Sequence, residues 1–170
     1  MTTTIGLREV EALQSLDEEQ FRSLERALTV QSFDDGHLFD RAGRKADRHR
    51  SALHIILGGQ VAVTSRARAA NQVPVERMMK AGEIVGLISF FKDGPRTATM
   101  RAVGPVCVAS LTREQYDQIL KASPALHSAF LFAMARQLAR DVRQCNDRLV
   151  SALQSAETPA APVATPGQPG

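Results

Sequence analysis

The sequence has little cysteine and no long apolar run, and each absence excludes a class of protein. Its two cysteines, Cys107 and Cys145, are too few for a disulfide framework, and no group of cysteines and histidines has the spacing of a zinc site. No stretch approaches the roughly 18 consecutive apolar residues of a transmembrane helix, so we expect no membrane span. The N-terminal residues 1–16 lack the basic region and apolar core of a signal peptide, which favours a cytoplasmic protein.

A set of catalytic residues is also missing from the sequence. The four histidines fall in different predicted elements, and no serine or cysteine lies beside a base within a motif; the histidines are His37, His49, His54 and His127. The net charge of +3 is mild, so it is compatible with an anionic partner without requiring one. The sequence therefore predicts a protein that is not an enzyme.

The chain of 170 residues, 44% hydrophobic and 23% charged, has the size and composition of one globular domain with a tail. Apolar residues at helical spacing predict a helix over 7–30, with a capping box beginning at Ser15. Residues 31–112 instead show short apolar runs at roughly ten-residue spacing, which favours an antiparallel barrel or sandwich. Within them, 51–65 is predicted to form two strands joined by a tight turn at Gly58-Gly59.

Residues 113–153 return to a helical pattern, with Thr112 as the N-cap of a first helix and Pro124 in the first turn of a long second one. Four residues of the long helix are spaced by four, three and four, as in a coiled coil: Leu138, Val142, Cys145 and Leu149. The four residues of this stripe either form the contact of a homodimer or pack against the domain itself, and we predict the homodimer. The Pro/Ala-rich residues 154–170 cannot bury enough apolar surface to fold and are predicted to be a disordered tail.

The stretch DRAGRKADRHR, residues 40–50, is rich in arginine. Contact with nucleic acid is one interpretation, and a solvated loop is the other. The loop is favoured because no aromatic residues for base stacking are interleaved with the basic ones.

The stretch GEIVGLISFFKDGPRTATMRA, residues 82–102, combines groups that suit a phosphate. Gly82 and Gly86 allow the backbone to approach a ligand closely. A helical turn at 88–91 would present backbone N–H groups to an anion, and Arg96 could supply a bidentate positive charge. Thr97 adds a hydroxyl group. Together these residues predict a cradle for one phosphate group.

The same stretch resembles the phosphate-binding cassette of the cyclic-nucleotide-binding domain family, to which the catabolite activator protein and protein kinase A regulatory subunits belong. Residues 32–63, with their spaced glycines and the run HIILGGQV, resemble the first half of that domain. The resemblance implies an α+β fold: an antiparallel β-barrel or jelly roll with N-terminal helices and a long C-terminal helix. It divides the chain into an N-terminal extension (1–12), a cyclic-nucleotide-binding-like domain (13–153) and the tail (154–170).

The resemblance also implies roles for the cassette residues. Arg96 takes the place of the arginine that pairs with the cyclic phosphate, and Gly86, Ile88, Thr97 and Ala98 fall at backbone or hydroxyl positions around it. Leu87 stands where the family has a glutamate that accepts a hydrogen bond from the ribose 2′-hydroxyl. Leucine cannot accept this bond, and a buried hydroxyl without a partner costs about 1–3 kcal/mol.

Two functions follow from the resemblance. The first is a non-enzymatic regulatory module that senses cyclic AMP or cyclic GMP and signals through a partner protein; no other cofactor is indicated. The second is an adaptor or subunit that works without nucleotide, its cassette being degenerate at Leu87. Because no helix-turn-helix pattern follows the long helix, we do not expect direct DNA binding.

Overall fold

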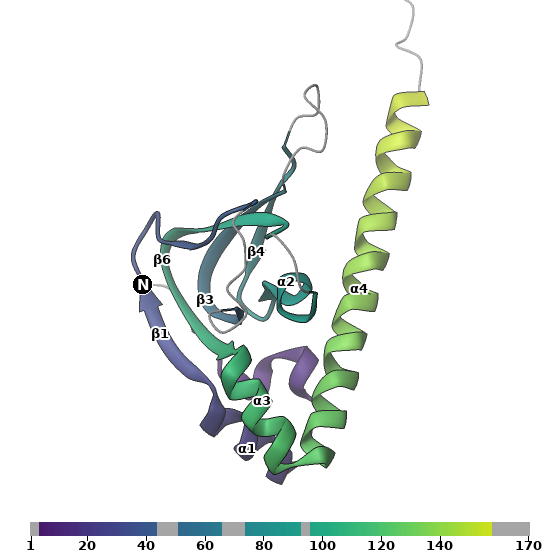
Figure 1. The fold of residues 1–170 in the computed structure, drawn as a ribbon. Helices are drawn as coiled ribbons and strands as arrows, with labels where there is room; N and C mark the ends of the chain where they lie inside the picture. The colour runs from purple at the N-terminus through teal and green to yellow at the C-terminus, as the bar shows by residue number, and fades with distance from the viewer. Residues whose placement is uncertain (1–3, 44–50, 66–73, 93–95, 158–170) are drawn as a thin grey trace, which may run out of the picture. The chain divides into compact units, whose positions relative to one another are not determined.

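The computed structural model describes residues 4–43, 51–65, 74–92 and 96–157 (Figure 1). By its internal contacts the chain divides into two units, Met1–Met134 and Ala135–Gly170. The first unit holds the sheet and the shorter helices, and the described part of the second is the distal part of one long helix.

Within the described residues, six strands form one antiparallel sheet, which is the predicted jelly roll. Two long strands organise it, since β3 and β6 pair with each other from Ala52–Thr112 to Ser65–Ala98. The strands β1 and β2 pair with β6, and β4 and β5 pair with β3. The strand bounds are β1 Thr29–Phe33, β2 Leu38–Asp40, β3 Ala52–Ser65, β4 Glu76–Lys80, β5 Ile84–Val85 and β6 Ala98–Thr112.

The Gly58-Gly59 pair does not form a turn, so the prediction of two strands over 51–65 is wrong. The chain runs through as the single strand β3, and its register with β6 shifts on either side of Gly58, as in a β-bulge. Gly59 has a φ of +81°, and a Cβ atom there would lie 2.3 Å from the carbonyl oxygen of Pro105. The bulge therefore requires glycine, both for its backbone conformation and for the close approach of β6.

The barrel interior is filled by apolar side chains from the strands. Eight of them form one buried cluster: Ile56, Val61, Met79, Val85, Met100, Ala102, Val106 and Val108. Phe33, Phe39 and Val63 pack against this cluster and are half-buried. The alternation of these residues along β3 and β6 places one face of each strand toward the core.

The N-terminal residues form shorter elements than the predicted helix over 7–30. Two 3₁₀ helices, η1 (Leu7–Glu9) and η2 (Glu11–Leu13), precede α1 (Glu18–Ala27). The helix α1 begins after Asp17, not Ser15, because the Asp17 carboxylate accepts a bond from the backbone N–H of Gln20 and the Gln20 side chain accepts one from that of Asp17. The segment before it joins the domain: the N–H of Ile5 donates to the carbonyl of Leu57, and Leu7 and Val10 are buried.

Two helices follow the sheet. As predicted, α3 (Arg113–Ala122) starts at a Thr112 N-cap, where the Gln115 side chain completes a capping box. Pro124 opens α4 (Pro124–Glu157), which runs beyond residue 153, where the sequence pattern ends the helix. The rest of the predicted tail lies outside the described residues. None of the helices within the described ranges has both the length and the apolar character that a membrane crossing requires.

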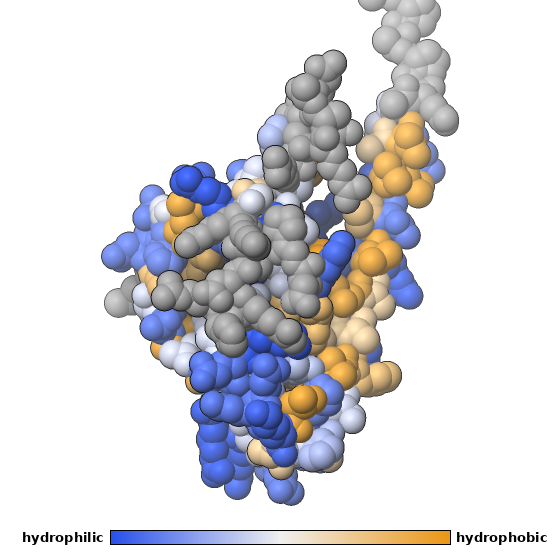
Figure 2. Space-filling model, in the orientation of Figure 1, coloured by the Kyte–Doolittle hydropathy of each residue, from blue (hydrophilic) through white to orange (hydrophobic). Residues whose placement is uncertain are grey.

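The distal part of α4 carries apolar residues on its surface. Val142, Cys145 and Leu149 of the predicted stripe are exposed, while Leu138 is half-buried. Leu153 is exposed as well, and Figure 2 shows apolar residues gathered along this part of the helix.

Candidate functional site

The short helix α2 (Leu87–Phe91) covers the turn predicted at 88–91 and fixes one end of the cassette. Gly86 precedes it as the N-cap with a φ of +83°, in the left-handed region. A Cβ atom on Gly86 would lie 2.9 Å from the carbonyl oxygen of Ala52 in β3. Glycine therefore allows α2 to begin directly against β3.

Arg96 lies just before β6 and is buried, with 8% of its side chain exposed. Its Nε is 2.7 Å from Oδ2 of Asp40, whose side chain is 9% exposed. Its Nη1 donates to Oγ of Ser51 over 3.3 Å, and the Ser51 hydroxyl donates in turn to the carbonyl of Ser89 in α2. The guanidinium is thus held by Asp40, the last residue of β2, and by Ser51, which links it to the cassette helix α2.

Leu87 is buried, with 4% of its surface exposed, and supplies no hydrogen-bond acceptor. Glu83, the carboxylate in the described part of the cassette, does not replace it. Glu83 forms an ion pair with Arg77 over 2.9 Å and accepts a bond from the backbone N–H of Lys80. It therefore closes the turn between β4 and β5.

The remaining predicted site residues are less enclosed. Ile88 is 56% exposed, and Thr97 is exposed as well. Ala98 is half-buried and begins β6. The structure thus gives buried positions to Leu87 and Arg96, with Gly86 beside the start of β3, while the side chains of Ile88 and Thr97 are solvent-accessible.

His54 on β3 lies in the electrostatic field of Arg96. Its Nδ1 is 2.8 Å from the hydroxyl oxygen of Ser110, and its ring is 5.1 Å from that of Phe39. Burial is the main cause that lowers the pKa of His54 from 6.5 to about 4, and electrostatic interactions with Arg96 and His37 contribute to the same shift. His54 is therefore neutral near pH 7, whereas the neighbouring Arg96 is positively charged.

The sequence did not point to Asp40, Ser51 or His54 as members of this site. Asp40 is the first residue of the basic stretch 40–50, where it reads as one acidic residue among arginines. Its pairing with Arg96 brings together two segments that are distant in sequence, and no local pattern encodes that contact. Residues 44–50 of the stretch lie outside the described residues.

The C-terminal end of α2 is connected to the helices that follow the sheet. Nη1 of Arg113 donates to the carbonyl of Phe90 over 3.1 Å, and the Phe90 ring packs edge-on against Tyr116 at 5.4 Å. The hydroxyl of Tyr116 lies 2.7 Å from Nε2 of His127, and its ring is 5.8 Å from Phe130. Burial raises the pKa of Tyr116, so this phenol stays protonated at neutral pH. Side chains of α2, α3 and the first turns of α4 therefore form one continuous aromatic contact.

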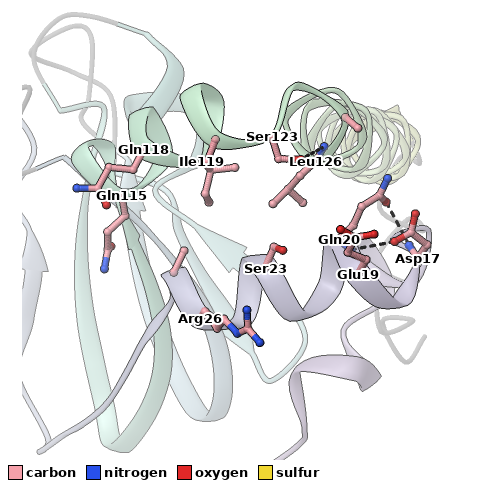
Figure 3. Close-up of a pocket in the computed structure, with 13 residues that line it drawn as sticks. Asp17, Glu19, Gln20, Ser23, Arg26, Gln115, Gln118, Ile119, Ser123 and Leu126 are labelled. Carbon is pink, nitrogen blue, oxygen red and sulfur yellow. Dashed lines mark hydrogen bonds between the residues drawn. The ribbon is translucent and has the colours of Figure 1, made fainter.

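A separate cavity of about 580 Å³ lies between α1 and the junction of α3 with α4, away from the cassette (Figure 3). Figure 3 shows Ser23 and Arg26 of α1 on one side and Ile119, Ser123 and Leu126 on the other. Of its two acidic lining residues, Asp17 and Glu19, Asp17 caps α1. None of the described cassette residues lines this cavity, so it is a groove between helices and separate from the predicted phosphate cradle.

A sequence model of the cyclic nucleotide-binding domain family matches residues 31–123, which include most of β1 and all of β2 to β6, α2 and α3. The chain belongs to this family.

Relatives with other domains contain similar segments. A cGMP-dependent protein kinase of Eimeria tenella is 30% identical over 114 residues, which are 67% of this chain and 10% of the kinase. An uncharacterized NTE family protein of Mycobacterium tuberculosis is 28% identical over 164 residues, which are 93% of this chain and 26% of that protein. The chain thus spans about a quarter or less of the length of these two relatives.

Among solved structures, a cyclic nucleotide-binding domain from Methylobacillus flagellatus has a similar fold, with a TM-score of 0.73. The likeness covers 89% of this chain and 88% of that one, at 21% sequence identity. At this identity the likeness shows the fold alone, and it agrees with the jelly roll and flanking helices described above.

Proposed function

We propose that this domain is a non-enzymatic regulatory module that binds a cyclic nucleotide at Arg96 and transmits the occupancy of that site to a partner protein. The observation that carries the proposal is the buried Arg96 guanidinium, which is bonded to Ser51 and through it to α2; the resemblance aligns this arginine with the one that pairs with the phosphate in the family. Membership of the cyclic nucleotide-binding domain family supports it, as does the similarity to a cGMP-dependent protein kinase.

The chemistry of binding assigns the phosphate to Arg96, whose planar fork matches two phosphate oxygens. Gly86, Ile88, Thr97 and Ala98 would surround the phosphate from the two ends of the cassette. The ribose 2′-hydroxyl would face Leu87 and lose its acceptor, which weakens binding roughly tenfold to a hundredfold. The proposed site is therefore a weak one, for cyclic AMP or cyclic GMP.

The aromatic contact between α2, α3 and the first turns of α4 supports a path by which ligand binding would affect these helices. A ligand on Arg96 acts on Ser51, and Ser51 is bonded to α2 through the carbonyl of Ser89. Movement of α2 would shift Phe90 against Tyr116, and with it the start of α4. A partner that contacts these helices would respond to occupancy of the site.

The stripe Leu138, Val142, Cys145 and Leu149 supports a homodimer as one such assembly. Three of the four side chains are exposed in the single chain, and their spacing matches a coiled-coil seam. Pairing of two helices would bury these residues.

A second function is favoured by Leu87. Because an apolar side chain is buried where the family has its ribose acceptor, the domain could act as an adaptor or subunit that needs no nucleotide. In that case the cassette serves only to close the barrel, and partner binding would be the same with and without ligand.

Isothermal titration calorimetry with cyclic AMP and cyclic GMP separates the two functions. We expect weak binding by the unaltered protein, no binding by Arg96→Ala, and unchanged binding by the matched control Arg101→Ala, which removes an exposed arginine from β6. Leu87→Glu should tighten binding about tenfold or more, because it restores the acceptor. If neither the unaltered protein nor folded Leu87→Glu binds either nucleotide, the adaptor function is the correct one.

A further inference from the structure

Asp40 is paired with the Arg96 guanidinium, which is the group that would bind the ligand's phosphate under the proposed function. Its Oδ2 lies 2.7 Å from Nε of Arg96, and neither side chain is more than 9% exposed. Its Oδ1 accepts a bond from the backbone N–H of Arg41 over 3.1 Å. The carboxylate is therefore held on both oxygens, one of them directed at the guanidinium of the cassette.

The backbone around Asp40 is fastened to the same region of the chain. The N–H of Gly43 donates to the carbonyl of Arg96 over 2.9 Å, and the N–H of Ala42 donates to the hydroxyl of Thr99 over 3.1 Å. The turn that follows β2 is thus bonded to the residues on either side of the start of β6. Asp40 reaches Arg96 from a fixed backbone, so the ion pair is built into the fold.

Among the described residues, the buried groups at this pair do not favour a second anion. Asp40 balances the charge of Arg96, and His54 adds no positive charge near pH 7 because its pKa is lowered to about 4. His37, the other group that acts on His54, is exposed to solvent. A phosphate that approached Arg96 with Asp40 in place would lie beside a carboxylate in a poorly solvated site, where like charges repel strongly.

We propose that Asp40 is an internal competitor for Arg96, so that a phosphate group binds at the cassette only by displacing the Asp40 carboxylate from the guanidinium. The inference rests on the proposed function and concerns the regulation of that same site. It makes Asp40 the residue that sets the affinity of the cassette for phosphate, whether the phosphate belongs to a cyclic nucleotide or is inorganic.

Asp40→Asn tests the competition, because it removes the charge and keeps the shape and one acceptor oxygen. Asp34→Asn is the matched control, since Asp34 is an exposed aspartate in the turn between β1 and β2. Inorganic phosphate and cyclic AMP are titrated separately and followed by calorimetry. We expect Asp40→Asn to bind phosphate about tenfold or more tightly than the unaltered protein, and Asp34→Asn to match the unaltered protein.

The two ligands separate this inference from the proposed function. A gain for inorganic phosphate without any binding of cyclic nucleotide would uphold the competition and contradict the proposed function. Binding of cyclic nucleotide that depends on Arg96 but is equal or weaker in Asp40→Asn would uphold the proposed function and overturn the competition, because Asp40 would then position Arg96 for the ligand. No gain with either ligand also overturns it.

A measurement on the unaltered protein covers the case in which Asp40→Asn does not fold. The Nε–H signal of Arg96 is assigned in a nitrogen-15 NMR spectrum by its loss in Arg96→Lys. Saturating phosphate should shift this signal together with the backbone N–H of Arg41, which is bonded to Asp40. A shift of the Arg96 signal with the Arg41 signal unmoved would mean that Asp40 stays in place, and it would overturn the proposal.

Discussion

Apolar side chains have opposite surroundings in the barrel and in the distal part of α4. The eight residues of the barrel cluster are at most 5% exposed, whereas Val142 and Leu149 of the helix are each 59% exposed. Burial of apolar surface is the main stabilising contribution to a fold. The barrel thus contains the residues that determine whether the chain folds, and the distal helix contains residues available for assembly. Substitutions in the two regions should have different consequences.

The largest expected effect is a loss of stability from truncating the barrel core. Ile56→Ala removes a fully buried side chain from the cluster and should lower the free energy of unfolding by about 2–5 kcal/mol. Leu149→Ala is the comparison in the helix and should change it by no more than about 0.5 kcal/mol. Urea denaturation followed by circular dichroism measures both. Equal losses in the two variants would show that the distal helix also belongs to the folding core.

The next largest effect is a pH-dependent loss of stability that is caused by His54 in the barrel. The pKa of His54 is about 4 in the folded chain and 6.5 without the fold, so between these values the unfolded chain binds more protons. Stability should therefore be full above about pH 6.5 and fall as the pH drops toward 4, by up to about 3 kcal/mol. His54→Asn removes this contribution, and the difference between the two urea curves at each pH measures it.

His37→Asn should retain most of the pH dependence due to His54, because burial is the larger cause of the lowered pKa. A pH dependence in His54→Asn as steep as in the unaltered protein would place the titrating group elsewhere.

Substitutions in the helix stripe should have the smallest effect on the stability of the fold and a clear effect on assembly. Val142→Asn combined with Leu149→Asn should leave the melting temperature nearly unchanged at dilute concentration, where the protein is monomeric, since both side chains are exposed in the single chain. It should weaken the proposed homodimer by about tenfold or more, because two apolar contacts are lost from the seam. Sedimentation equilibrium provides the measurement. An unaltered protein that stays monomeric at high micromolar concentration would contradict the dimer.

The sequence predicted those parts of the fold that depend on local patterns. Thr112 and Pro124 mark the starts of α3 and α4 because capping and proline geometry act within a few residues. At Gly58-Gly59 the local pattern predicts the wrong structure, because a glycine pair suits both a tight turn and a bulge. The choice between them is made by β6, which continues past both glycines and leaves no space for a Cβ atom at position 59.

The candidate site was predictable only where it follows the chain. The cassette pattern points to Gly86, Leu87 and Arg96 because their spacing is fixed along one segment, and their role in binding stays a prediction. Asp40 could not be predicted in this way, since its role comes from a contact between β2 and the start of β6 that depends on the folded sheet. A motif can therefore locate the arginine without revealing that a carboxylate of the same chain is already bound to it.

The two crowded glycines have a consequence for experiments on tolerance to substitution. A Cβ atom would lie 2.3 Å from a backbone oxygen at Gly59 and 2.9 Å at Gly86, and both residues have positive φ. If a saturation mutagenesis library is selected only for the abundance of the folded protein, with no nucleotide in the medium, nearly all variants at both positions should be lost. Depletion at Gly86 would thus reflect a requirement of the backbone conformation and not of ligand binding. The glycine that is typical of the family can therefore persist in a lineage that no longer binds any ligand.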